Sequence, residues 1–170
     1  MQMDQDTSID KWIKRFSWGF LLLAVLLGGI VIRTRFMVHP ISGTSMEESL
    51  HDGDHVLIDK QGRIVRYETI AFAVEGEEDM FVKRVIGVPG DAIIIQNETM
   101  IIDLGEEDNF KATIRVELTP ETAETLAGQT VIPKDQYFVI GDNTDVSVDS
   151  RSFGFVDKAE IEGVYQLRVW

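Results

Sequence analysis

The feature that most constrains this chain is an uninterrupted apolar run close to its N-terminus. Residues 16–32 read FSWGFLLLAVLLGGIVI, 17 residues without a charged side chain. As an α-helix rising 1.5 Å per residue, this run extends about 25 Å, close to the roughly 30 Å hydrocarbon core of a bilayer. Lys14, Arg15, Arg33 and Arg35 flank it and can extend their charged ends to the membrane surface. The sequence therefore predicts one transmembrane helix over residues 16–32.

Two other interpretations of the apolar run are a cleaved signal peptide and a helix buried in a core. Cleavage requires small residues at positions −3 and −1 after the run, whereas this run is followed by Arg33-Thr34-Arg35, so a retained anchor is favoured. Three basic residues precede the run and two follow it, which favours a cytoplasmic N-terminus. We expect residues 1–15 in the cytoplasm and residues 36–170 on the outer side of the cell membrane.

The charge of the body differs from that of the anchor region. Residues 1–35 carry five basic and three acidic side chains, and because the whole chain of 170 residues has a net charge of −13, residues 36–170 carry −15. An acidic body argues against nucleic acid as a partner, since a phosphate backbone requires a basic face. The chain has no cysteine, which excludes disulfides, a thiol nucleophile and cysteine-bound zinc.

Beyond the anchor, the hydrophobic pattern changes to short runs rich in β-branched residues. Gly, Pro, Asp or Asn separates these runs, which is typical of strands joined by turns. The predicted strands are residues 56–58, 70–74, 81–85, 92–95, 100–102, 113–118, 137–140 and 164–169. Residues 119–126 (TPETAETL) predict a helix, with an N-cap Thr, Pro at the first helical position and an early Glu. The fold class is therefore mainly β. Residues 97–134 carry no motif and are expected to be a variable insertion.

Several common catalytic and metal-binding patterns are not met. Residues 43–47 (GTSME) lack the second Gly of a nucleophile elbow. The histidines His39, His51 and His55 lie close to this segment in sequence, but loop histidines commonly have no catalytic role. Residues 51–55 (HDGDH) carry metal-capable side chains, yet such close neighbours in a loop rarely converge on one ion. We therefore expect neither a metal nor a cofactor.

One lysine occupies an unusual position for a charged side chain. If residues 81–85 form a strand, Phe81, Lys83 and Val85 share one face. Apolar neighbours penalise the charged amine, so we expect its pKa to fall below the ordinary value of about 10.4. A neutral amine can take the proton of a serine hydroxyl and later return it to a leaving amine. The alternative is that Lys83 extends to water from an edge strand, and spacing alone leaves both open.

Four motifs follow the anchor in order: SGTSMEESL, GDHVLIDK, FVKRVIGVPGD and GDNTDVSVDSRSFG. Together they resemble the bacterial type I signal peptidases, of the small single-anchor kind typical of Gram-positive bacteria, over nearly the whole chain. That resemblance implies the family's β fold of short antiparallel sheets behind one transmembrane helix. It also implies a membrane-anchored Ser–Lys endopeptidase that removes signal peptides from exported preproteins, cutting after small residues at −1 and −3. The expected partners are an extended signal peptide, bound as an added strand, and the lipid bilayer.

The resemblance assigns roles to the residues that match the motifs. It implies that Ser45 is the nucleophile, Lys83 the general base and Ser147 the serine that orients the lysine amine. The backbone N–H of Ser45 is then one oxyanion donor, and Met46 matches a residue near the substrate pocket. Some relatives supply a second donor from a serine two positions before the nucleophile, where this chain has Gly43, so that donor is unassigned.

Two supporting ion pairs are also implied, one between Asp149 and Arg151 and one between Asp142 and Arg84. This chain departs from the family pattern at two places. Relatives usually have Pro where this chain has Glu48, in the sequence Glu47-Glu48-Ser49-Leu50, and usually have Arg after the GDN motif, where this chain has Thr144. These departures bear on substrate preference and rate.

Two alternatives come from other functional classes. The departures at Glu47-Glu48 and Thr144 motivate a non-catalytic relative that serves as an assembly factor or chaperone for surface proteins such as pilins. Loss of Ser45 or Lys83 would favour it, but both are present. A self-cleaving repressor-type Ser–Lys protease also carries a Ser-Met motif, and the anchor and the lack of a DNA-binding domain count against it.

Overall fold

The computed structural model describes residues 6–74, 80–105 and 112–170. The chain divides into two compact units, Met1–Met37 and Val38–Trp170. Each unit is described by itself below.

The first unit is dominated by one long helix, α1 (Asp6–Arg35). Its segment Trp18–Arg35 is long and apolar enough to cross a membrane, and none of that segment is buried. A helix packed into a protein core would bury one face, so the core-helix interpretation does not fit. The predicted span of residues 16–32 lies within α1. The helix extends past both ends of that span because neither flank contains Pro or Gly.

The second unit is built around a seven-stranded sheet with the strand order β1-β2-β10-β3-β4-β8-β9. These strands are β1 (Phe36–Pro40), β2 (His55–Asp59), β10 (Ile161–Arg168), β3 (Thr69–Phe72), β4 (Phe81–Gly87), β8 (Gln136–Ile140) and β9 (Val156–Asp157). The pairs from β2 to β9 are all antiparallel. The order places β4 inside the sheet, between β3 and β8.

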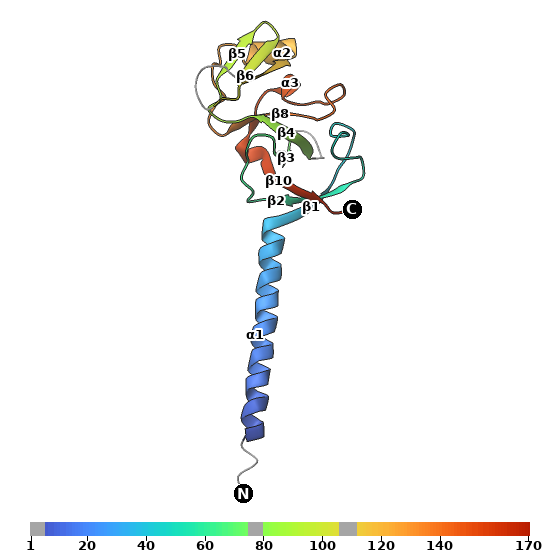
Figure 1. Ribbon diagram of the computed structural model, residues 1–170, viewed down its shortest axis with the longest axis vertical. Coiled ribbons are helices and arrows are strands. Elements are labelled where there is room, and N and C mark those ends of the chain that lie inside the picture. The colour runs from blue at the N-terminus through green and yellow to red at the C-terminus, as the bar shows by residue number, and fades with distance from the viewer. Residues whose placement is uncertain (1–5, 75–79, 106–111) are drawn as a thin grey trace. The chain divides into compact units, whose positions relative to one another are not determined.

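A second sheet has three antiparallel strands, β5 (Ile93–Gln96), β6 (Thr99–Asp103) and β7 (Thr113–Glu117). It is followed by α2 (Pro120–Thr125), whose N-cap Thr119 accepts a hydrogen bond from the N–H of Thr122. Two short helical segments, α3 (Ser150–Phe153) and η1 (Lys158–Glu160), lie further along the chain. Within the body, β5, β6 and α2 lie at one end and β2 and β10 at the other, with β4 and β8 between them (Figure 1).

The predicted fold class, mainly β with short antiparallel sheets behind an N-terminal helix, is confirmed. All eight predicted strands and the helix after Thr119 are present within a few residues of their expected bounds. The strands β1 and β9 were not predicted. β9 has only two residues, and β1 follows the apolar helix directly, so neither gives a periodic signal of its own.

Two apolar clusters share strand β8. Tyr137 and Val139 pack in a cluster with residues of β3, β4 and β10, whereas Phe138 packs in the other with residues of β5 and β6. Alternate residues of a strand point to opposite faces, so both faces of β8 are covered. Each fully buried aliphatic or aromatic side chain contributes roughly 1.5–3 kcal/mol of burial free energy. The centre of the sheet is therefore a rigid support for side chains on β4.

Candidate active site

The candidate active site begins with the lysine on β4. Lys83 is paired in register with Ile70 of β3, and the next residue, Arg84, is paired with Ile140 of β8. Only 4% of Lys83 is exposed, and its Nζ lies 5.1 Å from the ring centroid of Phe81. Strand β4 is internal, so the interpretation that Lys83 reaches water from an edge strand is wrong.

The amine of Lys83 lies 2.7 Å from the hydroxyl oxygen of Ser45. It also donates to the backbone carbonyl of Val82, at 3.2 Å. Burial lowers the pKa of Lys83 to about 8, against the opposing attraction of the Asp149 carboxylate. About a tenth of the amines are then neutral at pH 7. The expected direction of this pKa agrees with the structure, and the pair can exchange a proton.

Ser45 lies outside any strand, in a turn formed by residues 42–50, called the nucleophile turn below. The carbonyl of Met46 accepts from the N–H groups of Ser49 and Leu50, at 2.8 and 2.7 Å. The N–H of Glu47 donates to the carbonyl of Thr44, at 3.2 Å. These backbone hydrogen bonds close the turn without the proline that the family pattern has at position 48.

Gly43 explains a further local feature of the nucleophile turn. Its φ angle is +84°, in the left-handed region that favours glycine. Its N–H donates to Oδ1 of Asp52, at 2.8 Å. This N–H is therefore already paired, and Gly43 has no side chain that serves as a second oxyanion donor.

The loop after β8 contacts the nucleophile turn directly. Asn143 donates its backbone N–H to the carbonyl of Ser45, at 2.9 Å, and its side-chain amide to the carbonyl of Thr44, at 3.1 Å. A Cβ on Gly141 would lie 2.6 Å from the carbonyl oxygen of Ser45, closer than real Cβ atoms approach. Sequence reasoning assigned no role to Gly141 or Asn143. The signal was present, because both belong to the GDN motif.

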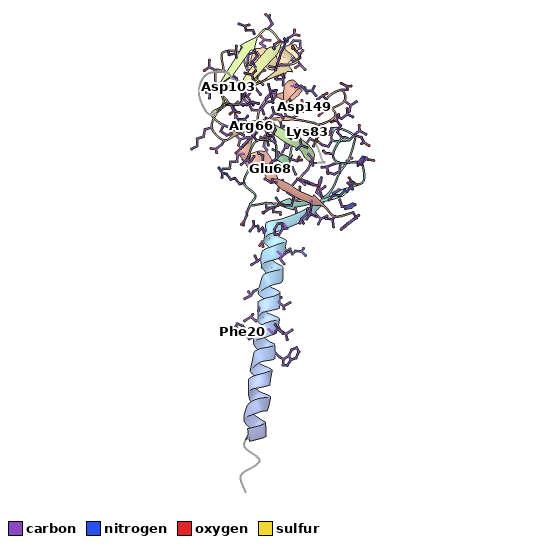
Figure 2. The ribbon with its side chains drawn as sticks, in the orientation of Figure 1. Phe20, Arg66, Glu68, Lys83, Asp103 and Asp149 are labelled. Atoms are coloured by element: carbon purple, nitrogen blue, oxygen red, sulfur yellow. The ribbon has the colours of Figure 1, made fainter. Side chains whose placement is uncertain are left out.

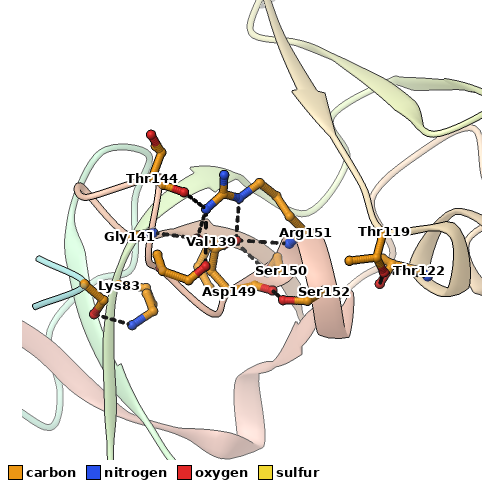
Figure 3. A network of polar contacts seen from close by, with 12 residues as sticks. Lys83, Thr119, Thr122, Val139, Gly141, Thr144, Asp149, Ser150, Arg151 and Ser152 are labelled. Carbon is orange, nitrogen blue, oxygen red and sulfur yellow. Dashed lines mark hydrogen bonds and ion pairs between the residues drawn. The ribbon is translucent and has the colours of Figure 1, made fainter. Parts of the chain in front are cut away.

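An ion pair between Asp149 and Arg151 fixes this loop. Nε and Nη2 of Arg151 lie 2.8 and 2.9 Å from the two carboxylate oxygens of Asp149, which also accepts the N–H of Gly141. Figure 3 shows the guanidinium between this carboxylate and the carbonyl of Thr144, to which it donates at 2.8 Å. Because the contact uses the backbone of residue 144, it does not depend on the side chain there.

The second expected ion pair also forms. Nε and Nη2 of Arg84 lie 2.8 and 2.6 Å from the two carboxylate oxygens of Asp142. The hydroxyl of Ser49 donates to the same carboxylate, and the N–H of Asp142 points to the sulfur of Met46 at 3.4 Å. The pair therefore joins β4 to both the loop after β8 and the nucleophile turn.

Both carboxylates are ionised at neutral pH. Burial alone raises the pKa of Asp149, but hydrogen bonds from Arg151 and from the N–H of Gly141 outweigh it and hold this pKa below its ordinary value. The same balance lowers the pKa of Asp142, where burial is outweighed by hydrogen bonds from Arg84 and Ser49. Lys83 and Asp149 are both buried in the body (Figure 2), which accounts for the attraction between their charges.

The structure does not give Ser147 its expected contact. Its hydroxyl is buried and makes no direct hydrogen bond to the amine of Lys83, and it acts instead on the carboxylate of Asp149, whose pKa it helps to lower. Its carbonyl accepts from Arg151 at 3.3 Å. The position of this serine is set by that backbone contact, and its hydroxyl stays close to Gly141.

A pocket of about 290 Å³ opens beside Ser45 and Lys83. It is lined by residues 41–46, residues 80–83, Val146 and Val148. Met46 is among the lining residues, as expected, although it is 1% exposed. Val146 and Val148 are 57% and 58% exposed, so the apolar rim of this pocket is open to a binding partner.

The histidines and the HDGDH segment have structural contacts. His55 stacks on Trp170 with ring centroids 4.8 Å apart, and Asp54 accepts from Arg168 at 3.2 Å. Within the described parts of the chain, no three His, Asp or Glu side chains are grouped closely enough to hold a metal ion.

The chain is similar in sequence to proteins of one known family. The family model described as "Signal peptidase, peptidase S26" matches residues 10–170. Signal peptidase IB of Staphylococcus aureus is 32% identical over 180 residues, covering 94% of this chain and 88% of that protein. Signal peptidase I of Bacillus licheniformis is 30% identical over 179 residues, covering 97% and 94%. A solved signal peptidase I from Enterococcus faecalis V583 aligns at 27% identity and a TM-score of 0.42, covering 62% of this chain and 98% of that one.

Proposed function

The chain belongs to the signal peptidase family, peptidase S26, and from this premise we propose that it is a membrane-anchored serine endopeptidase that removes signal peptides from exported preproteins. The observation that carries the proposal is the 2.7 Å contact between Lys83 Nζ and Ser45 Oγ, together with a lysine pKa of about 8. A buried amine that loses its proton near neutral pH is suited to act as a general base. Ser45 is then the nucleophile and Lys83 the base.

Acylation uses both residues in turn. Neutral Lys83 takes the hydroxyl proton of Ser45 as its oxygen attacks the scissile carbonyl carbon. The backbone N–H of Ser45 donates to the oxyanion that forms. The ammonium then gives its proton to the leaving amine, which is the new N-terminus of the mature protein, and the signal peptide stays bound to Ser45 as an ester. Water completes the cycle. Neutral Lys83 takes a proton from the water as the water oxygen attacks the ester carbonyl carbon, and the resulting ammonium returns a proton to Ser45 Oγ as the ester C–O bond breaks. The signal peptide leaves as a free acid, which ionises, and both the hydroxyl and the neutral amine are restored.

The pocket beside the pair fits an extended peptide with small side chains. Its volume of about 290 Å³ and its apolar rim suit small residues at −1 and −3. The substrate binds as an added strand, with main-chain hydrogen bonds that provide affinity. Met46 is one of the residues that line this pocket.

Helix α1 anchors the enzyme. We place residues 1–15 in the cytoplasm, the apolar span in the cell membrane and the catalytic body outside, as the basic flanks favour. Nucleophile and anchor are separated by 13 residues, which span at most about 43 Å when extended. A signal peptide also presents its cleavage site just beyond its own apolar run, so both partners meet at the membrane surface.

The departures from the family pattern at Glu48 and Thr144 suggest that the enzyme has a dedicated substrate. Glu48 is exposed at the nucleophile turn, and a pilin or another surface protein is a candidate substrate. The alternative of a non-catalytic assembly factor for such proteins does not require a buried lysine against a serine hydroxyl. The contact between Ser45 and Lys83 therefore favours the enzyme.

The test is cleavage of a preprotein by the detergent-solubilised full chain. Products from a substrate with Ala at −3 and −1 are located by mass spectrometry. We expect one cut directly after the −1 residue, lost in Ser45→Ala and in Lys83→Ala but retained in Lys60→Ala, a matched variant at an exposed lysine. Equal rates for Ser45→Ala and the parent would refute the proposal.

A further inference from the structure

We propose that Asp52 is a positioning residue for the nucleophile turn, and this inference rests on the proposed peptidase function. Its carboxylate Oδ1 accepts the backbone N–H of Gly43 at 2.8 Å. Gly43 lies two residues before Ser45, and both line the pocket. A side-chain oxygen that accepts a backbone N–H holds the chain in one local conformation. Asp52 therefore acts on the reaction through the backbone that carries the nucleophile.

The conformation of Gly43 shows why this part of the turn needs support. Its φ angle is +84°, in the left-handed region. A glycine can also adopt many other backbone conformations, because it has no side chain to restrict them. No atom outside its neighbours lies within 4 Å of where its Cβ would be. Packing therefore does not hold Gly43, and the hydrogen bond to Asp52 replaces it.

Asp52 itself is carried by a fixed loop. The N–H of Ile41 donates to the carbonyl of Asp54 at 2.7 Å, and the N–H of Gly53 donates back to the carbonyl of Ile41 at 3.0 Å. The side chain of Asp54 accepts the N–H of His51 at 2.9 Å. These bonds join the loop to the strand that precedes the nucleophile turn, so Asp52 approaches Gly43 from a rigid base.

The nucleophile turn is then held from two sides. Asn143, in the loop after β8, donates to the carbonyls of Thr44 and Ser45. Asp52, in the loop before β2, accepts the N–H of Gly43. Fixing both ends of a three-residue segment sets the direction of the Ser45 N–H and hydroxyl. An error of about 1 Å in the placement of a reacting group can lower a rate about a hundredfold. Asp52 is exposed, so its removal should disturb this placement more than it disturbs the fold.

The experiment separates the acceptor from the charge of Asp52. Asp52→Asn keeps a side-chain oxygen that can accept the N–H of Gly43 but removes the charge, whereas Asp52→Ala removes both. Steady-state cleavage of the preprotein by full-length protein in detergent gives kcat and KM, and thermal unfolding checks the fold. We expect Asp52→Ala to lower kcat by roughly tenfold with a smaller change in KM, and Asp52→Asn to retain most of the parent kcat. Glu162→Ala, at an exposed acid on β10, serves as the charge control and should match the parent.

The pH profile completes the test. If Asp52 acts through the backbone, the acid limb of kcat/KM stays at the pH of the parent in Asp52→Ala, because burial and Asp149, which set the pKa of Lys83, are unchanged. Equal losses in Asp52→Asn and Asp52→Ala, a shifted acid limb, or parent activity in Asp52→Ala would each overturn the inference. An inactive parent would instead contradict the proposed function, so the two failures are distinguishable.

Discussion

The two reacting side chains lie in opposite kinds of surroundings. Lys83 is on an internal strand, 4% exposed and flanked by β3 and β8. Ser45 is in a turn outside any strand, and hydrogen bonds from Asn143 and, one step removed, Asp52 hold it. The lysine needs burial because removal from water is what lowers its pKa in this site. The serine needs access to substrate, so loops rather than a core must position it. The site combines a base made by packing with a nucleophile placed by hydrogen bonds.

The largest effects on activity should come from removing either reacting group, and only removal of the lysine should change the stability. Ser45→Ala and Lys83→Met should each lower kcat/KM by at least about a thousandfold. Ser45→Ala should leave the free energy of unfolding nearly unchanged. Lys83→Met should raise the free energy of unfolding by up to about 3 kcal/mol at pH 7, because folding no longer buries a charged amine. Denaturant unfolding measures the difference.

The pH dependence of that gain follows from the lowered pKa of Lys83. The unfolded chain holds the lysine proton up to about pH 10.5, and the folded chain releases it at about pH 8. The stability of the parent is therefore reduced as pH falls from about 10.5 to 8, and the cost is complete below 8. The advantage of Lys83→Met should shrink between pH 8 and 10. An advantage that is constant over this range would contradict a buried, neutral amine.

The next largest effect should come from breaking the ion pair between Asp149 and Arg151, near the base Lys83. Asp149 is fully buried and paired with Arg151, and removing one partner of a buried pair costs about 3–5 kcal/mol. Asp149→Asn should therefore lower the free energy of unfolding by an amount near this range. Because Asp149 also raises the pKa of Lys83, the acid limb of the activity profile should move to lower pH in any folded fraction. An unchanged limb in folded protein would show that the two groups do not interact.

A change in pH alone should have a smaller effect on kcat/KM for each pH unit. If the neutral amine is the base, kcat/KM should rise about tenfold per pH unit below about pH 8 and level off above it. Preprotein cleavage from pH 6 to 10, with circular dichroism as the control for the fold, measures this. A rate that falls between pH 7 and 9 in folded protein would exclude a lysine base.

The smallest effect should come from the nucleophile region. Asn143→Ala removes the side-chain hydrogen bond to the carbonyl of Thr44 but keeps the backbone bond to Ser45. We expect kcat to fall a few-fold to about tenfold, with little change in the melting temperature because Asn143 is partly exposed. A large fall in the melting temperature with kcat nearly unchanged would contradict the view that hydrogen bonds of the loops serve to position Ser45.

Sequence reasoning succeeded where burial and periodicity carry the information. The runs at residues 81–85 and 137–140 have β-branched residues bounded by turn formers, and both are strands. The same pattern placed Phe81 and Val85 on the face of Lys83, but it left open whether the lysine is buried or extends to water, and only the internal position of β4 decides between the two. The pairing of Ser45 with Lys83 was predicted from the family resemblance, because these residues are far apart in sequence.

The contacts of the nucleophile turn were beyond the reach of sequence patterns. The carboxylate of Asp52 accepts the N–H of Gly43, and the side-chain amide of Asn143 donates to the carbonyl of Thr44. Such side-chain-to-backbone hydrogen bonds depend on the φ and ψ angles of two loops at once, and no periodicity encodes them. The hydroxyl of Ser147 shows the same limit, because the partner of a loop hydroxyl depends on the backbone path of the loop, which no periodicity encodes.

Gly141 has a practical consequence for studying substrates. A methyl group at this seam between two loops collides with the carbonyl of Ser45 while leaving the hydroxyl and the amine chemically intact. Gly141→Ala should therefore yield a misaligned catalyst that keeps both reacting groups, a form suited to capturing uncleaved preproteins and identifying them.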